Sequence, residues 1–438
     1  MHSQKNRSCL IFGHSIDAIT SAVVLASLGN QVQMVSKIDK LNDTLVKYEF
    51  EYHVLALWQL YLQNNLIINA SFIDFDSVLD VVPYNIEAIW CFVDDWFYSP
   101  NDDKIDELKE TYINAINKSQ NQTVAYVFSG KNQIGYFADI SESIHHPWVY
   151  YVPFVFLQDG QAYSSMLNPK LWLLGEKTKD SWQRLKILQP FMHQSKQSYV
   201  ADIATIEFAR SSIMGMLATR VSYMNELSRL ADAKNVDITT VSNIMGLDER
   251  IGASYLKAGW GFGGRTLPAE VDMLANSFLQ SSTDIQLIKA VSNINDDQKE
   301  LIFRKFWQYF DGLIDKKTVM IWGASYKAGS GTTQNSAIHP LLSLLWSYDI
   351  KTLVCADKAA GELLALYPKQ PKLELITNPY NKLEQAQAIF VLNWDYEQPP
   401  QVARVNEVAV PIFDTQNIFT VDQLDKLISD YIGIGRKG

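Results

Sequence analysis

The same local pattern, a strand, a glycine turn, a helix and a second strand, occurs near each end of this 438-residue chain. The first copy occupies residues 9–35 and turns at Gly13, and the second occupies residues 319–355 and turns at Gly323. Strands that alternate with helices imply a parallel sheet with helices on both faces. Each end of the chain is therefore expected to form its own α/β domain.

Between the two copies the character of the chain changes near Ala201. Residues 203–231 contain no proline and a single glycine, and apolar residues recur at steps of three and four, which predicts one long helix. Two neighbouring apolar stripes predict that this helix is buried on more than one side. One stripe contains Ile206, Ala209, Ile213 and Met216, and the other contains Leu217, Val221, Met224, Leu227 and Leu230.

The predicted helix would be about 43 Å long, more than one small domain needs. We therefore expect it to span two domains and to form the contact of a homodimer, with a single internal core helix as the alternative. The expected fold is α/β, with two Rossmann-like parallel-sheet domains joined by this central helix and a helical block. The predicted domains are residues 1–200, 201–314 and 315–438.

Composition excludes several classes of protein. The chain has 38 basic and 48 acidic residues and a net charge of −10, which argues against a surface for nucleic acid or anionic lipid. No segment approaches ~18 uninterrupted apolar residues, so we expect no membrane insertion. Three cysteines without CxxC spacing and a polar N-terminus favour a cytoplasmic location. His145 and His146 have only one carboxylate nearby in sequence, so no metal site is expected.

Four stretches of the chain together carry a specific pattern, and they are residues 13–18, 207–226, 248–270 and 323–336. The most specific parts read DERIG at 248–252 and YLKAGWGFGG at 255–264. Over nearly the whole chain the sequence resembles the nucleotide-sugar 6-dehydrogenases, the family of UDP-glucose and GDP-mannose dehydrogenases. The resemblance implies oxidation of a sugar C6 alcohol to a carboxylate with two NAD⁺, through a thiohemiacetal on a cysteine.

The positions that this chemistry would use carry other residues here. Thr266 stands where the resemblance implies the cysteine, and a threonine hydroxyl has no accessible anion near pH 7 without strong activation. Arg210 stands at a catalytic lysine and cannot act as a base, because its guanidinium stays protonated. The remaining changed positions are Met214 for an asparagine, Val155 for a glutamate, Ala269 for a lysine and Glu270 for an aspartate.

The dinucleotide fingerprint is also incomplete. It needs three glycines and an acid after the second strand, and these positions read Gly13, Ser15, Ala18 and Ser36. Ser15 hinders close approach to a pyrophosphate, and Ser36 lacks the carboxylate that would hold the adenosine ribose. Asp94 and Asp95 add two negative charges at the sheet edge where the pyrophosphate would lie. We therefore expect no cofactor, and NAD only if the chain is an active dehydrogenase.

The positions implied for a nucleotide sugar are better kept. Arg250, Lys257 and Lys327 are cations at such positions, whereas Gln334 and Gln416 stand where the family carries arginines. The other implied contacts are Tyr255, Gly261, Phe262, Gly263 and Gly264. Each lost charged contact costs ~1.5–3 kcal/mol. Weakened binding of a UDP-sugar is one interpretation, and a glycine loop that only preserves the fold is the other.

Features that hold the fold persist in this sequence, whereas features that hold the chemistry differ. We therefore expect a pseudoenzyme that acts as a scaffold, regulatory subunit or sugar-nucleotide sensor, with a protein partner in a larger assembly as a further expectation. One alternative is an active NAD-dependent nucleotide-sugar dehydrogenase. Another is an enzyme that performs a single two-electron oxidation, which needs no thiol. The resemblance implies a place in polysaccharide biosynthesis.

Overall fold

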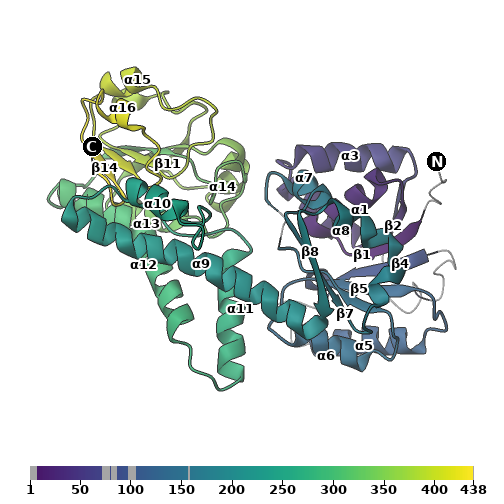
Figure 1. Ribbon diagram of the computed structural model, residues 1–438. Coiled ribbons are helices and arrows are strands. Elements are labelled where there is room, and N and C mark those ends of the chain that lie inside the picture. Colours follow the sequence, from purple (N-terminus) through teal and green to yellow (C-terminus); the bar gives the residue numbers. More distant parts are fainter. Residues whose placement is uncertain (1–6, 72–78, 80–85, 97–104, 156–157, 438) are drawn as a thin grey trace. The chain divides into compact units, whose positions relative to one another are not determined.

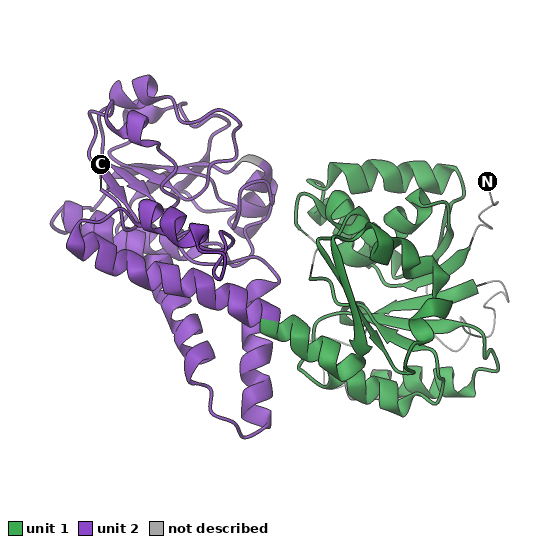
Figure 2. Cartoon of the chain, viewed as in Figure 1, with its two compact units in different colours: residues 1–212 green, residues 213–438 purple. Residues whose placement is uncertain are grey.

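The computed structural model of the protein describes residues 7–71, 79, 86–96, 105–155 and 158–437. The chain divides into two compact units, Met1–Ser212 and Ile213–Gly438 (Figure 2). The boundary falls inside one long helix, α9 (Ile203–Lys234). The segment predicted as a helical domain, residues 201–314, therefore begins in the first unit and lies mostly in the second.

The first unit is built on an eight-stranded sheet in the order β3-β2-β1-β4-β5-β6-β7-β8. All its neighbouring strands are parallel except β6 and β7, which are antiparallel. Its strands are β1 (Ser8–Phe12), β2 (Gln31–Ser36), β3 (Ile67–Ser71), β4 (Ile86–Phe92), β5 (Ala125–Ser129), β6 (Val149–Tyr151), β7 (Leu171–Glu176) and β8 (Gln197–Asp202).

Helices cover both faces of this sheet (Figure 1). One face carries α1 (Ile16–Ser27), α3 (Tyr52–Gln63), α7 (Ala162–Leu167) and α8 (Gln189–Gln194), which share one apolar core with the strands. The other face carries α5 (Ile105–Lys118) and α6 (Tyr136–Ser143). The further helix α2 (Ile38–Lys47) follows β2, and the 3₁₀ turn η1 (Val93–Asp95) follows β4. This layering is the predicted parallel-sheet arrangement.

The second unit has a six-stranded parallel sheet in the order β11-β10-β9-β12-β13-β14. Its strands are β9 (Thr318–Trp322), β10 (Lys351–Cys355), β11 (Leu373–Leu375), β12 (Ile389–Val391), β13 (Ile412–Asp414) and β14 (Tyr431–Gly433). Its helices are α10 (Ile238–Leu247), α11 (Leu267–Gln280), α12 (Gln286–Tyr309), α13 (Ile338–Ser347), α14 (Ala360–Leu366), α15 (Val402–Asn406) and α16 (Val421–Leu424). The predicted fold class, with two Rossmann-like sheets and a long helix, is confirmed.

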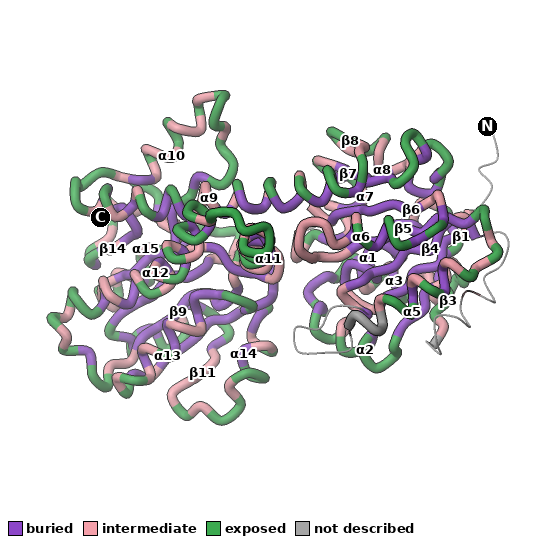
Figure 3. The backbone as a smooth tube through the Cα atoms, turned by 90° about the horizontal axis from the view of Figure 1, so that it is seen from below, coloured by how far each residue is buried: buried purple, intermediate pink, exposed green. Residues whose placement is uncertain are grey.

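The strands at the centre of each sheet are buried apolar runs (Figure 3). Residues 9–12 and 319–322, which the sequence predicts as strands, lie within β1 and β9. A strand that is covered on both faces can hide every side chain, so it reads as a continuous apolar run without polar alternation. The predicted strand at 88–93 ends one residue earlier, because Val93 already begins the turn η1.

The predicted burial of α9 is wrong at two positions. Met216 and Leu230 are 60% and 55% exposed, although the sequence places both in buried stripes. The buried side of the helix instead carries polar residues that hydrogen-bond, such as Asn225, whose side chain accepts from the backbone N–H of Gly259. A hydrophobic pattern cannot identify a face that is buried through hydrogen bonds, because it scores polar residues as exposed.

No helix in the described part of the chain is both long and apolar enough to cross a membrane.

Candidate functional site

The turn between β1 and α1 is the first candidate site, because a dinucleotide phosphate binds at this place in a Rossmann unit. Strands β1 and β4 are parallel neighbours, so the residues after each strand meet at the same edge of the sheet. The carboxylate of Asp95, in η1, lies on this turn. Its Oδ2 accepts hydrogen bonds from the backbone N–H groups of His14 (2.8 Å) and Ser15 (2.9 Å). The donors that would face a phosphate are therefore already paired.

Gly13 allows this contact. A Cβ at residue 13 would lie 2.7 Å from Asp95 Oδ2 and 3.0 Å from the Cβ of Ala18. The glycine that the sequence assigns to a nucleotide fingerprint therefore has a role inside the protein, which is to admit a carboxylate of the same chain. Ser15 caps the following helix, since its hydroxyl accepts from the Ala18 N–H at 3.3 Å.

The neighbouring acid, Asp94, is tied to another turn. Its Oδ1 accepts from the backbone N–H of Lys131 at 2.8 Å, and a Cβ at Gly130 would lie 2.6 Å from the same oxygen. Burial raises the pKa of Asp94 and of Asp95 to about 6 in each case, and the backbone N–H bonds act in the opposite direction. Both groups are thus mainly ionised at pH 7.

At the position that would hold the adenosine ribose, the side chain forms a local hydrogen bond. Ser36 is fully buried at the end of β2, and its hydroxyl donates to Asn69 Oδ1 at 2.9 Å. As it stands, this turn does not present the free donors and the acid by which a Rossmann unit holds NAD. The two phosphate-facing donors are taken by a carboxylate, and the ribose position has neither a free acid nor a free hydroxyl.

The second candidate site is the glycine-rich loop at residues 259–264 in the second unit. Buried side-chain amides fix its backbone. Asn295 of α12 accepts from the N–H of Phe262 (2.7 Å) and donates to the carbonyl of the same residue (3.2 Å). Gln298, one turn later, donates to the carbonyl of Gly259 at 2.8 Å. Together with Asn225, which accepts from the N–H of Gly259, these amides hold the loop at Gly259 and at Phe262.

Two glycines of this loop are required by close contacts. Gly261 has a φ of 116°, and a Cβ there would lie 2.5 Å from Asn295 Oδ1. A Cβ at Gly263 would lie 2.5 Å from the carbonyl oxygen of Asn335. The loop also pairs with the segment after β9, because the Gly264 N–H donates to the carbonyl of Gln334 at 2.8 Å. The backbone of this loop is thus fixed by close contacts and hydrogen-bonded to the segment after β9.

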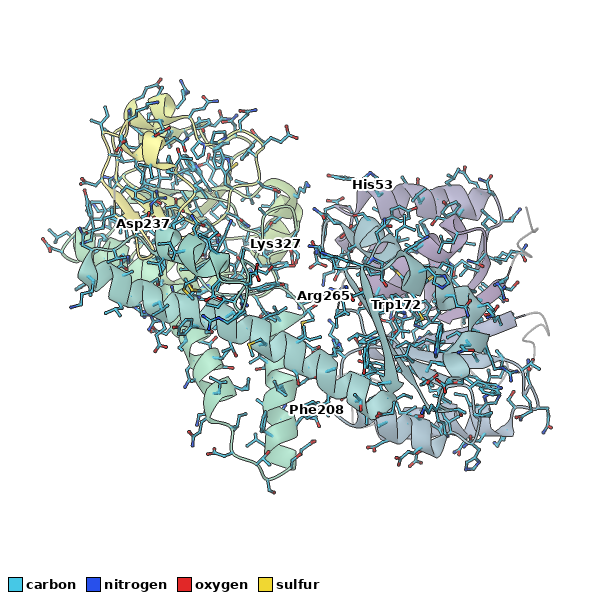
Figure 4. All side chains as sticks on the ribbon, in the orientation of Figure 1. His53, Trp172, Phe208, Asp237, Arg265 and Lys327 are labelled. Atoms are coloured by element: carbon cyan, nitrogen blue, oxygen red, sulfur yellow. The ribbon has the colours of Figure 1, made fainter. Side chains whose placement is uncertain are left out.

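The cations predicted for a nucleotide sugar lie at the surface of the second unit. Lys257 and Lys327 are exposed, and Lys327 follows the turn after β9 (Figure 4). Arg250 is also exposed and forms an ion pair with Asp248 at 2.7 Å. Tyr255 is 48% exposed with a φ of 59°. A Cβ placed on Gly259 would contact the Thr415 carbonyl and the Gln416 amide, so Gln416 adjoins the loop.

The residues predicted at the catalytic positions fall into both units. Val155 and the buried Arg210 belong to the first. In the second unit, Thr266 precedes α11 and its side chain makes no capping hydrogen bond, while Ala269 follows within that helix. Glu270 and Met214 are buried. The roles of these residues remain predictions.

Sequence reasoning missed the amides that shape the glycine loop. Asn295 and Gln298 lie on the buried face of α12, among apolar residues such as Val291 and Ile302. Polar residues on an otherwise apolar helical face were the available signal, because a buried amide needs hydrogen-bond partners. Among the described residues, no group of three or more His, Cys, Asp or Glu side chains could hold a metal ion.

Residues 204–297 match the family model described as "UDP-glucose/GDP-mannose dehydrogenase family, central domain". The UDP-glucose 6-dehydrogenase of Pseudomonas aeruginosa is 29% identical over 288 residues, which cover 64% of each chain. A putative UDP-glucose 6-dehydrogenase of Bacillus subtilis, YtcA, is 30% identical over 43% of this chain and 44% of its own. The matches thus span less than two thirds of these relatives' lengths.

Two solved structures share the fold over nearly the whole chain. A UDP-glucose dehydrogenase from the archaeon Pyrobaculum islandicum superposes with a TM-score of 0.80 at 16% identity, covering 100% of this chain and 99% of its own. A UDP-D-ManNAc dehydrogenase from Pyrococcus horikoshii gives a TM-score of 0.74 at 13% identity, covering 98% and 99%. At these identities the likeness concerns the fold alone.

Proposed function

Because the chain belongs to the UDP-glucose/GDP-mannose dehydrogenase family, we propose that it is a catalytically inactive member that retains a nucleotide-sugar pocket. In this role it acts as a sugar-nucleotide sensor, a regulatory subunit or a scaffold. The proposal has two parts, loss of the cofactor site in the first unit and persistence of the sugar-nucleotide loop in the second.

The observation that carries the first part is the Asp95 carboxylate on the N–H groups of His14 and Ser15. A dinucleotide phosphate would need these same donors. It would also lie beside an ionised carboxylate, and two unit charges 4 Å apart repel by about 4 kcal/mol at an effective dielectric constant near 20. Cofactor binding would therefore require Asp95 to leave its two hydrogen bonds.

The residues at the predicted catalytic positions support the same conclusion. Thr266 offers a hydroxyl where the family resemblance implies a thiolate, and Arg210 offers a permanent cation where it implies a lysine. The chain's three cysteines, at positions 9, 91 and 355, are all buried in the sheets, far in sequence from Thr266.

The second part is supported by the glycine loop. Its backbone is held by Asn225, Asn295 and Gln298, so its shape does not depend on a ligand. A preformed loop loses little entropy on binding, which partly offsets weaker charge contacts. Exposed Lys257 and Lys327 remain available to phosphates, whereas Gln334 and Gln416 offer amide donors without a positive charge.

An active NAD-dependent dehydrogenase is the second candidate function. It is favoured by the names of the relatives, which are UDP-glucose 6-dehydrogenases. Under this alternative the oxidation would need a proton acceptor other than a lysine at position 210, because that residue is Arg210. Turnover therefore has to be measured together with binding.

A homodimer through α9 is also part of the proposal. Met216, Tyr223 and Leu230 follow one another at intervals of seven residues and are 60%, 50% and 55% exposed. An apolar row with this spacing lies along one side of a helix and is the kind of surface that a second helix covers. We further propose a cytoplasmic location and a protein partner in a larger assembly.

The test is thermal unfolding with UDP-glucose, UDP-N-acetylglucosamine, GDP-mannose, NAD⁺ or NADP⁺, alongside absorbance at 340 nm with UDP-glucose and NAD⁺. A ligand at about 100 times its Kd stabilises by about 2.7 kcal/mol. We expect a higher midpoint with a sugar nucleotide, no change with NAD⁺ and no NADH formation. Stabilisation by NAD⁺, or NADH above the no-enzyme rate, would refute the inactive assignment. No response to any sugar nucleotide would remove the sensor role.

A further inference from the structure

We propose that Asp95 and Trp96 form an internal plug that replaces both ends of a dinucleotide in the first unit. This inference rests on the proposed function and explains why the cofactor turn keeps its shape without a cofactor. It also implies a latent nucleotide site, which is closed by two adjacent side chains and can be opened by replacing them.

Asp95 replaces the phosphate end. A phosphate at a helix N-terminus is held by backbone N–H groups of the turn, and a carboxylate makes the same charge-assisted bonds. Both bonds to Asp95 are made by a single oxygen, Oδ2, at 2.8 and 2.9 Å. The turn therefore has its anion supplied from within the chain.

Trp96 replaces the adenosine end. Trp96 is 7% exposed, and its indole stacks on Phe12, the last residue of β1, with 4.1 Å between ring centroids and 27° between planes. The Lys37 ammonium lies 5.0 Å from the centre of the same indole. Lys37 directly follows Ser36, the position at which a Rossmann unit holds the adenosine ribose. A planar aromatic group of the chain thus lies beside the place of the ribose.

The plug is anchored on both sides. The backbone N–H of Trp96 donates to the carbonyl of Val93 at 3.1 Å, which closes the turn η1. The preceding Asp94 is bound to the backbone N–H of Lys131. Gly13 provides the space for the Asp95 carboxylate. These contacts fix the two plug residues against the end of the sheet without any ligand.

The plug, and not Ser15, is therefore what excludes a dinucleotide. Ser15 differs from the fingerprint glycine by one hydroxymethyl group, and that group caps α1. Restoring the glycine alone leaves Asp95 on both donors. Removing the carboxylate and the indole frees the two N–H groups and the face of Phe12 while leaving the backbone turn in place.

The experiment measures NAD⁺ binding by isothermal titration calorimetry to the full chain and three variants. The double variant Asp95→Gly/Trp96→Ala opens the plug, Asp95→Asn keeps its shape without the charge, and Ser15→Gly restores the fingerprint with the plug in place. We expect at least about tenfold tighter binding by the double variant than by the other three proteins, which is about 1.4 kcal/mol.

The outcomes separate the two proposals. NAD⁺ binding by the unaltered protein would refute the proposed loss of the cofactor site. A double variant that keeps its circular dichroism spectrum but does not bind NAD⁺ would refute the plug alone. If the double variant does not fold, the Ser15→Gly variant provides the test. NAD⁺ binding by this variant would overturn the plug, and the absence of binding would support it.

Discussion

Replacing Asn295 by alanine tests whether buried amides hold the glycine loop. The substitution removes the acceptor of the Phe262 N–H and the donor to the Phe262 carbonyl, at 2.7 and 3.2 Å, in a site where Asn295 is only 4% exposed. Each buried polar group left unpaired costs about 1–3 kcal/mol, so the expected loss of stability is about 2–4 kcal/mol. For a unit of this size that is about 5–15 °C in the unfolding midpoint, measured by circular dichroism.

Asn406 provides a matched control in the same unit. Its side chain makes the same pair of bonds, from the N–H of Ile428 at 3.0 Å and to the carbonyl of Lys426 at 2.8 Å, but near the surface. Water can replace these bonds, so Asn406→Ala should cost less than about 1 kcal/mol. Equal midpoint shifts for the two variants would show that burial does not set the energy of the loop contact, and the argument for a preformed loop would fail.

Three further predictions concern charge, assembly and thiols. Burial raises the pKa of Glu207 to about 7, although its carboxylate accepts N–H bonds at the start of α6. The pKa of Glu207 is higher in the folded state than in the unfolded state. The stability that its protonated carboxyl contributes is therefore fully present below about pH 4.5 and is lost as pH rises through 7. Glu207→Gln should therefore make the unfolding midpoint depend less on pH over that range, and an unchanged slope of midpoint against pH would contradict this. Tyr223→Glu should turn a dimer into a monomer in light scattering, and a dimeric variant would exclude the α9 surface. Cys9, Cys91 and Cys355 are buried, so a thiol reagent such as DTNB should react only after unfolding, and rapid labelling of the native protein would contradict the fold.

The apolar runs, glycine turns and helical periodicity in the sequence were sufficient to predict the two-sheet architecture. The run at residues 9–12, its glycine turn and the following helix predict the first sheet, and the same signals at 319–355 predict the second. Such signals are short-range and depend on burial of one element against its neighbours. The family could also be identified from short motifs, because the loop at 255–264 is contiguous in the sequence.

Only the tertiary structure decided what the candidate sites contain. Asp95 reaches the turn at His14 from 81 residues away because β1 and β4 are neighbours in the sheet. Asn295 reaches Phe262 from 33 residues away because α12 packs against the loop. The sequence records neither contact, since hydrogen bonds between distant segments leave no periodic pattern. A sequence therefore shows which residues stand at the positions of a site, and the fold determines which distant residues of the chain contact them.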